Sequence, residues 1–336
     1  MINPTKSYRN TFIVLLIALL IISMINISLG SVYIPIKQIL LTFINGEVDK
    51  ESWKTIVLNY RLPKMITAIL VGSGLSISGL LMQTLFRNPL AGPFVLGISS
   101  GASLGVAILI LGASFLGANI TSYAFTNFGL AIAASLGAFL VLSAVMLAAI
   151  KVRNTMSILI IGLMFGSLTS AVISVLAYFS SAAELQQYMF WSFGSLGNLS
   201  WNEIIALFSV FIIGITLVTF IIKPLNSLLL GENYAKSMGV NVKQTRNITL
   251  IATSLLTGVI TAFSGPIAFI GLAVPHLTKL LFSTSNHKTL LPAVAITGAI
   301  IMLICDSIAQ LPNSEYTLPI NAITSLLEHL LLFGYS

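Results

Sequence analysis

The sequence predicts an all-α polytopic membrane protein. Hydrophobic residues make up 57% of its 336 residues and charged residues only 7%, and the mean hydropathy is +1.01. A soluble domain has about a quarter of its residues charged, so the apolar excess of this chain must face lipid. No charged residue lies between Arg9 and Lys37 or between Arg87 and Lys151. Such runs do not alternate as barrel strands do, and helices are the other fold that satisfies the backbone in lipid.

Turn residues divide the apolar runs into ten predicted spans within one transmembrane domain, residues 1–336. A bilayer core requires about 20 apolar residues per helix. The spans are 11–30, 61–86, 94–113, 127–150, 157–180, 203–222, 247–263, 266–283, 290–308 and 317–335. Ser264, Gly265 and Pro266 separate the seventh span from the eighth. The first run is longer than a signal-peptide core and lacks a clean cleavage site, so we interpret it as a retained helix.

An even number of spans places both termini on one side, and the positive-inside rule predicts that this side is the cytoplasm. Eleven of the sixteen basic residues then lie in inner segments. They are Lys6, Arg9, Arg87, Lys151, Arg153, Lys223, Lys236, Lys243, Arg246, Lys279 and Lys288. The net charge of +7 therefore reflects topology and gives no reason to invoke nucleic acid as a partner.

Two basic residues stand at the predicted outer mouth of the second span. Arg61 and Lys64 are three residues apart, so they share one helix face. Either their side chains reach the lipid headgroups, or they form a basic binding site for an acidic partner outside the membrane.

The longest inner connection, from Pro224 to Arg246, is polar. Glu232 to Lys236 predict a short helix that ends at Gly239. A second amphipathic piece with Val242 and Lys243 is expected to follow. The segment is either a surface loop on the headgroups or a rigid lever docked in a soluble motor protein.

Several motifs, taken together, resemble one family of permeases. They are Arg61-Leu-Pro-Lys64, Gly79 to Gln83, Leu85 to Ala91, Leu96 to Ala102, Leu230 to Val240, Gly265 to His276, and Leu318 to Thr324. In this order and spacing the chain is similar to the FecCD/BtuC-type permease subunits of ATP-binding-cassette (ABC) importers for iron siderophores, haem and vitamin B12. The resemblance covers the chain from Arg61 to about Phe333.

The resemblance implies a multi-pass permease of the bacterial cytoplasmic membrane that pairs with a second copy or a sister permease. It implies two cytoplasmic ABC ATPase subunits and an extracytoplasmic substrate-binding protein. No Gly-x4-Gly-Lys-Ser/Thr motif occurs here, so ATP and magnesium would bind the ATPase chain. We expect no catalytic residue, metal site or cofactor in this chain. The expected cargo is an iron chelate, a siderophore ahead of haem or cobalamin.

By resemblance, Arg61 and Lys64 accept acidic residues of the binding protein. Lysine at the second position keeps the charge but loses the bidentate fork of arginine. A third basic contact of the family corresponds to Gln310 here, which weakens or replaces it. The coupling residues implied for the ATPase are Gly231, Glu232, Ala235, Lys236, Gly239 and Arg246.

The fifth and tenth spans line the translocation path in the family. Small and polar residues on these spans are therefore the predicted path residues. They are Gly166, Ser167, Ser170, Asn321 and Ser325. Glycines four residues apart, as at Gly101 and Gly105, indicate either close helix packing or a hinge.

An alternative function is ion-coupled secondary transport, which places carboxylates at the midplane and often uses an internal repeat. Only Glu328 is near the midplane, and its neighbour His329 points about 100° away on a helix. A second alternative is an intramembrane hydrolase, because Gly101-Ala-Ser-Leu-Gly105 matches the Gly-x-Ser-x-Gly string. That string starts a membrane helix here and lacks the strand that precedes it in hydrolases.

Overall fold

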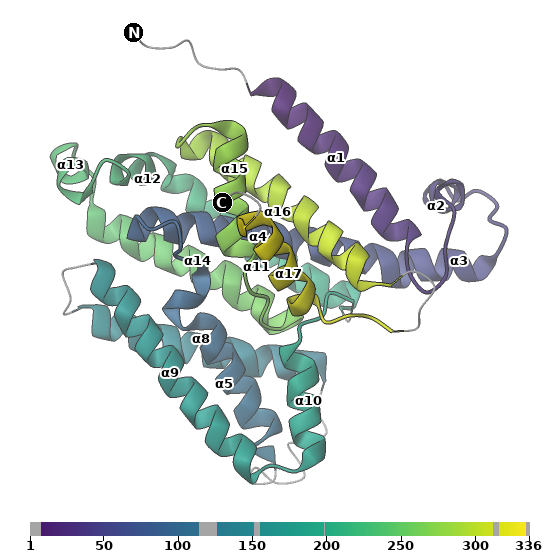
Figure 1. Ribbon diagram of the computed structural model, residues 1–336, viewed down its shortest axis with the longest axis horizontal. Helices are drawn as coiled ribbons and strands as arrows, with labels where there is room; N and C mark the ends of the chain where they lie inside the picture. Colours follow the sequence, from purple (N-terminus) through teal and green to yellow (C-terminus); the bar gives the residue numbers. More distant parts are fainter. Residues whose placement is uncertain (1–7, 114–125, 151–154, 198, 312–315, 334–336) are drawn as a thin grey trace.

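The computed structural model describes residues 8–113, 126–150, 155–197, 199–311 and 316–333. Lys6, Lys151 and Arg153 lie outside the described residues, as do the side chains of Glu328 and His329. The described chain is helical, with turns and loops between the helices (Figure 1). In order, the elements are α1 (Arg9–Ser28), α2 (Ile36–Phe43), α3 (Glu51–Ile56), the π-helical turn η1 (Val57–Arg61), α4 (Leu62–Phe86), the 3-10 turn η2 (Pro93–Leu96), α5 (Ile98–Ile110), α8 (Asn127–Ile150), α9 (Thr155–Phe179), α10 (Ala182–Ser192), α11 (Trp201–Phe220), α12 (Ile222–Leu228), α13 (Glu232–Ser237), α14 (Val242–Ser264), α15 (Ile270–Phe282), α16 (His287–Ala309) and α17 (Ile320–Phe333).

The all-α polytopic prediction is confirmed. Among the described residues, seven helices are long and apolar enough to cross a membrane. Helices α5 and α15 are shorter apolar helices of 13 residues, and α17 has 14 residues. Each of the ten predicted spans therefore corresponds to one helix. The predicted break before the eighth span is also confirmed, because α14 ends at Ser264 and Gly265 has a φ of +74°.

Helix α4 lies at the centre of the molecule, with 83% of its spanning window buried. It packs against α14, α15 and α16. Glycines make these contacts close: a Cβ on Gly72 would overlap the carbonyl of Gly298, and one on Gly79 would overlap the carbonyl of Gly271. Backbones approach closely only where side chains are small, which is the usual way that membrane helices pack.

Helices α5, α8, α9 and α10 form the lower part of the molecule in Figure 1. The α5–α8 contact is built on Gly101 and Gly105 from α5 and Gly137 from α8. A Cβ on Gly101 would lie 2.6 Å from the Gly137 carbonyl oxygen. Of the two interpretations of this glycine repeat, close packing is the one that the contact supports.

The second span begins earlier than predicted. Its helix is continuous from Glu51 to Phe86, 36 residues, whereas the sequence predicted a start at Arg61. A proline is tolerated in the first turn of a helix but usually disrupts a helix interior. In the structure the π-helical turn Val57–Arg61 precedes Pro63, and the Leu62 amide donates to the Val57 carbonyl. This wider turn lets the helix run through the proline.

The second amphipathic piece of the inner loop was also predicted wrongly as a separate element. Val242 to Arg246 form the first turns of α14, which continues into the membrane span. The Asn241 side chain caps this helix by accepting a hydrogen bond of 3.0 Å from the Gln244 amide. Helices α2, α10 and α12 were not predicted, because they are short and lie between spans, and α3 was missed because it belongs to the unpredicted beginning of the second span.

Candidate functional site

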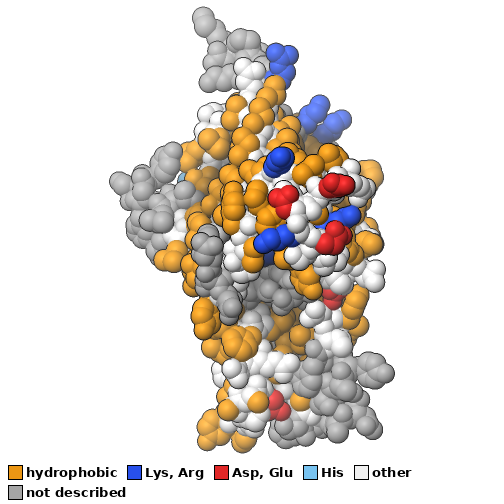
Figure 2. Space-filling view, turned by 90° about the vertical axis from the view of Figure 1, so that its right-hand side faces the viewer, with side chains coloured by type: hydrophobic (Ala, Val, Ile, Leu, Met, Phe, Trp, Pro, Cys, Tyr) orange, Lys and Arg blue, Asp and Glu red, His pale blue; other side chains and the backbone are white. Residues whose placement is uncertain are grey.

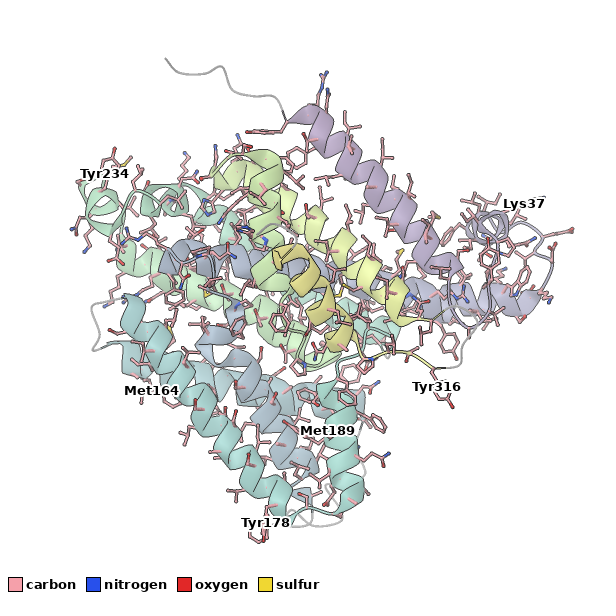
Figure 3. All side chains as sticks on the ribbon, viewed as in Figure 1. Lys37, Met164, Tyr178, Met189, Tyr234 and Tyr316 are labelled. Carbon is pink, nitrogen blue, oxygen red and sulfur yellow. The ribbon has the colours of Figure 1, made fainter. Side chains whose placement is uncertain are left out.

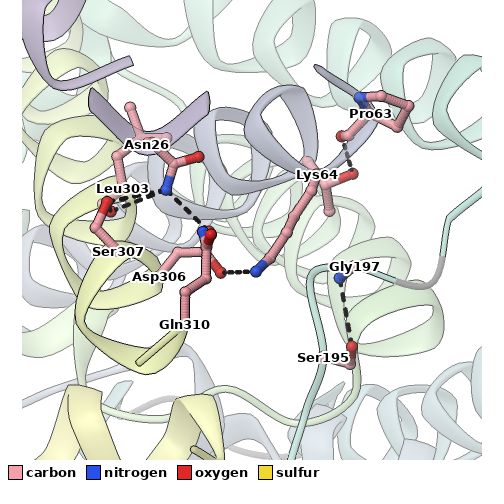
Figure 4. Close-up of polar contacts among 10 residues, drawn as sticks. Asn26, Pro63, Lys64, Ser195, Gly197, Leu303, Asp306, Ser307 and Gln310 are labelled. Carbon is pink, nitrogen blue, oxygen red and sulfur yellow. Dashed lines mark hydrogen bonds and ion pairs between the residues drawn. The ribbon is translucent and has the colours of Figure 1, made fainter. Parts of the chain in front are cut away.

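A buried polar cluster lies at one end of α4. The Lys64 ammonium and the Asp306 carboxylate form an ion pair of 3.0 Å, with side-chain exposures of 21% and 3% (Figure 4). The Gln310 amide donates to the other Asp306 oxygen at 2.7 Å. A buried carboxylate is stable only when it is paired and hydrogen-bonded, and Asp306 meets both conditions.

Asn26 of α1 completes this cluster. Its amide donates to the Asp306 carboxylate at 2.9 Å and lies 3.0 Å from the Ser307 hydroxyl (Figure 4). One carboxylate therefore joins α1, α4 and α16. The role of Asn26 was not predicted, although an asparagine in an otherwise apolar run is a signal that could have indicated it.

Arg61 lies next to the cluster and caps the end of α1. Its guanidinium donates to the carbonyls of Ile27 at 2.7 Å and Ser28 at 2.9 Å, and also to that of Val32. The last carbonyls of a helix lack partners within it, and a cation beside them is favoured by the helix dipole.

The structure brings the three predicted docking residues together around Gly30. A Cβ on Gly30 would lie 3.2 Å from the Arg61 Cζ and 3.4 Å from the Gln310 Oε1. Lys64 belongs to the same cluster through Asp306. All three side chains also make hydrogen bonds or ion pairs within the chain, so their docking role stays a prediction.

Charged side chains of both signs gather on the face beside this cluster. Figure 2 shows this patch surrounded by hydrophobic side chains, over the end of the molecule that carries α2 and α3. The exposed charged residues of this segment are Lys37, Glu47, Asp49, Lys50 and Glu51. Asp49 is fixed to α2 through Gln38, whose amide donates to it at 2.6 Å.

The predicted coupling segment, residues 224–246, lies at the opposite end of the molecule. Figure 3 shows Tyr234 of α13 pointing away from the fold there, while Lys37 lies at the other end. The predicted short helix is confirmed as α13, and Gly239 follows it with a φ of +82°. The Val240 amide closes this turn on the Ala235 carbonyl at 3.0 Å. Glycine is favoured at such a left-handed position.

The remaining predicted coupling residues include both buried and exposed positions. Ala235 is fully buried and Lys236 is exposed. Gly231 has a φ of +112°, and a Cβ there would lie 3.4 Å from the Arg87 guanidinium. The end of α4 therefore contacts the loop that begins α13. Arg246 lies about one turn inside α14 and lines a surface cavity.

A hydrogen-bonded relay makes a second connection between α4 and the coupling segment. His287 at the start of α16 contacts Thr84 of α4 through Nε2 at 2.8 Å and Asn226 of α12 through Nδ1 at 2.7 Å. The Asn226 oxygen also accepts from the His287 backbone amide at 2.9 Å, which fixes it as an acceptor. Nδ1 must therefore carry a proton, and in the neutral ring Nε2 is an acceptor. It competes for the single Thr84 hydroxyl proton with the Leu80 carbonyl, which lies 2.9 Å from the same oxygen.

This relay was missed because its three residues lie on three different elements. Each residue by itself is an ordinary helix-end residue. Only the fold brings them together.

The predicted path residues fall into two groups. Ser167 and Ser170 are exposed on α9, and the Ser170 hydroxyl donates to the Gly166 carbonyl at 3.0 Å. Within the described chain, α9 is the candidate span with the smallest buried share, 17%. An exposed face of this kind is available to a pore, a partner subunit or lipid, so the role of these residues stays a prediction.

Asn321 has a structural role that the sequence did not predict. Its amide donates to the carbonyls of Ser192 at 3.1 Å and Pro266 at 2.5 Å, and its oxygen accepts from the Ala268 amide at 3.1 Å. It therefore fixes the start of α17 to the turn between α14 and α15. The Ser325 hydroxyl lies one turn further on and donates to the Asn321 carbonyl at 2.7 Å.

Comparison with known proteins agrees with this arrangement. The FecCD transport family matches residues 15–333. The hemin transport system permease protein HmuU of Yersinia pestis is 34% identical over 93% of this chain and 91% of its own length. The vitamin B12 import system permease protein BtuC of Salmonella typhi is 36% identical over 81% of this chain and 80% of its own.

A solved structure of a metal-chelate type ABC transporter in an inward-facing conformation has the same fold. Its TM-score with this chain is 0.84 at 28% identity, and the match covers 97% of this chain and all of that one. The family match spans nearly the whole sequence, and the helices of this chain follow those of a solved transporter. The chain belongs to the FecCD transport family and is a transmembrane permease subunit of an ABC transporter.

Proposed function

We propose that this permease imports an iron chelate, a siderophore ahead of haem or cobalamin, from an extracytoplasmic binding protein into a bacterial cytoplasm. Two copies, or this chain and a sister permease, enclose the path. Two ABC ATPase subunits, which bind ATP and magnesium, drive the transport. Both termini and the α12–α13 segment face the cytoplasm, as the distribution of basic residues favours.

One observation carries the proposal: a single helix runs from Glu51 to Phe86 and has a candidate contact site at each end. Arg61 and Lys64 lie in its outer part, beside the charged face of α2 and α3. Thr84 and Arg87 lie at its inner end, against the coupling segment. A rigid element between two contact sites is what an ATP-driven importer needs, because docking and hydrolysis occur on opposite sides of the membrane.

The test is uptake into proteoliposomes that contain the permease with the ATPase encoded beside its gene. The matching binding protein is loaded in turn with labelled ferric siderophore, haem or cobalamin. We expect ATP-dependent uptake of the ferric siderophore that requires the binding protein. Uptake of haem or cobalamin alone would reassign the cargo. Uptake driven by a proton gradient without the ATPase would refute the mechanism.

A further inference from the structure

A long apolar groove runs between α8, α11 and α14. It encloses about 630 Å³ and is lined by Leu136 and Phe139 of α8, Val210 of α11, and Ile251 and Leu255 of α14. These helices are three of the candidate membrane spans. The groove therefore opens within the hydrocarbon layer, where an apolar hollow is filled by a chain of matching chemistry.

A second cavity of about 400 Å³ continues the groove along the same pair of helices. Met146 and Leu147 line it from the next turns of α8, and Lys243, Arg246 and Asn247 line it from the first turns of α14. Residue numbers rise along α8 and fall along α14 in this direction, as expected for antiparallel neighbours. The two cavities thus form one seam that changes from apolar to cationic.

The length of the seam matches one leaflet of a bilayer. From Lys243 to Val259 the α14 helix rises about 24 Å, at 1.5 Å per residue. Half of a bilayer with its headgroups is about 20–22 Å thick. The cationic end therefore lies at headgroup depth when the apolar end reaches the midplane.

The cationic end has the charge needed for an anionic headgroup. The residues that line this cavity include two cations, Lys243 and Arg246, and no carboxylate. Both residues lie in the first turns of α14, where the helix dipole adds positive potential. Basic pockets between membrane helices on the cytoplasmic side are typical sites for acidic phospholipids.

We propose that this seam binds one anionic phospholipid, with its phosphodiester between Lys243 and Arg246 and an acyl chain along the groove. A free anion would use only the cationic end and leave the apolar groove unfilled. A neutral lipid would use only the groove. The continuity of the two parts favours a single amphipathic ligand that uses both.

Gly258 provides a direct way to test the apolar half. It lines the groove, and a Cβ placed on it would meet no atom within 4 Å. Its φ is not in the left-handed region, so a larger side chain fits without backbone strain. The Gly258→Phe variant should fill the groove and displace the acyl chain.

The experiment is native mass spectrometry of the full-length permease in detergent, titrated with phosphatidylglycerol or with phosphatidylcholine of the same acyl chains. Two cations near a headgroup predict a preference for phosphatidylglycerol of about thirtyfold at low salt. The double variant Lys243→Gln with Arg246→Gln should remove this preference. The Gly258→Phe variant should weaken the binding of both lipids.

Matched controls separate the site from general effects of charge and bulk. The pair Lys223→Gln with Lys288→Gln removes two exposed cations outside the seam, and Ile17→Phe adds bulk to the exposed face of α1. These variants should bind both lipids as the native protein does.

Equal affinity for the two lipids in the native protein would overturn the proposal. A Gly258→Phe variant that becomes monomeric but still binds the lipid would also overturn it, because the groove would then be an interface between two copies of the chain. The readout is lipid binding, so the result is independent of the proposed transport and of any role of Arg246 in coupling.

Discussion

Lys64 and Asp306 form an ion pair of 3.0 Å between α4 and α16, and the aspartate is almost fully buried. The pair is part of a cluster in which Asn26 and Gln310 also donate to the carboxylate. The same lysine is predicted to receive the binding protein. The Lys64 side chain thus belongs both to the packing of three helices and to the surface that is predicted to bind the partner.

The Asp306→Asn substitution should destabilise the permease by about 3 kcal/mol, because it leaves the Lys64 ammonium without its carboxylate in a mostly buried site. Thermal unfolding of the purified protein in detergent measures this loss. Adding Lys64→Met to the first substitution should restore most of the stability, because the unpaired charge is then gone. If the single and double variants unfold at the same temperature, the ion pair does not act as described.

The Arg61→Met substitution should loosen the end of α1. The guanidinium donates to three carbonyls there, and its loss is expected to cost about 1 kcal/mol for a half-buried site. Hydrogen exchange of residues 27–34 should become faster, whereas the control Lys54→Met should leave it unchanged. Affinity for the binding protein, measured on both variants, then separates docking from capping. Unchanged exchange in Arg61→Met would contradict the capping role.

Two helix-interior glycines should respond to alanine in opposite ways. Gly79→Ala places a Cβ against the Gly271 carbonyl and should lower the yield of folded protein severalfold. Gly258→Ala meets only open space and should raise the stability by up to about 1 kcal/mol, through higher helix propensity. Size-exclusion profiles and thermal unfolding report both effects. Equal behaviour of the two variants would show that the α4–α15 contact is not as close as described.

The Gly239→Leu substitution should uncouple ATP hydrolysis from uptake. A residue other than glycine at a φ of +82° costs roughly 1–2 kcal/mol, and a Cβ there meets no other atom within 4 Å. The strain is therefore confined to the shape of the coupling turn. Gly239→Asn is the matched control, since asparagine tolerates this conformation better. Normal uptake per ATP in the leucine variant would count against a coupling role.

The His287→Phe substitution should reduce uptake per ATP hydrolysed by about tenfold. Phenylalanine fills the space of the ring but cannot bond Thr84 or Asn226, so α12 loses its polar connection to α4. If the relay acts as a unit, Asn226→Ala should have a similar effect, and the double variant should add little to either. Additive losses from the two single variants would show that the residues act separately.

Much of the architecture was predictable from the sequence. Hydropathy predicted the seven helices that are long enough to cross a membrane, because a spanning segment must be apolar and about as long as the bilayer is thick. It also located the shorter helices α5, α15 and α17. The Gly265–Pro266 break and the glycine after α13 were also predictable, because both depend on local backbone conformation.

The features that were predicted wrongly or missed depend on contacts or backbone geometry that a local sequence pattern does not contain. The predicted start of the second span at Arg61 was wrong, because the π-helical turn Val57–Arg61 continues the helix upstream of Pro63. Asn26 and Lys64, which contact Asp306, and Thr84 and Asn226, which contact His287, lie on helices far apart in the sequence, so no local pattern contains these contacts. Arg61 looked like a free surface cation until the fold placed three carbonyls around it.

The uninterrupted helix from Glu51 to Phe86 has a mechanical consequence. At 1.5 Å per residue it is a rod of about 54 Å, nearly twice the hydrocarbon thickness. Pivoting such a rod by about 5° around its tightly held middle displaces each tip by about 2 Å in opposite directions. In the proposed importer, docking of the binding protein at the outer tip would therefore move the inner tip against the ATPase, with no molecule crossing the membrane.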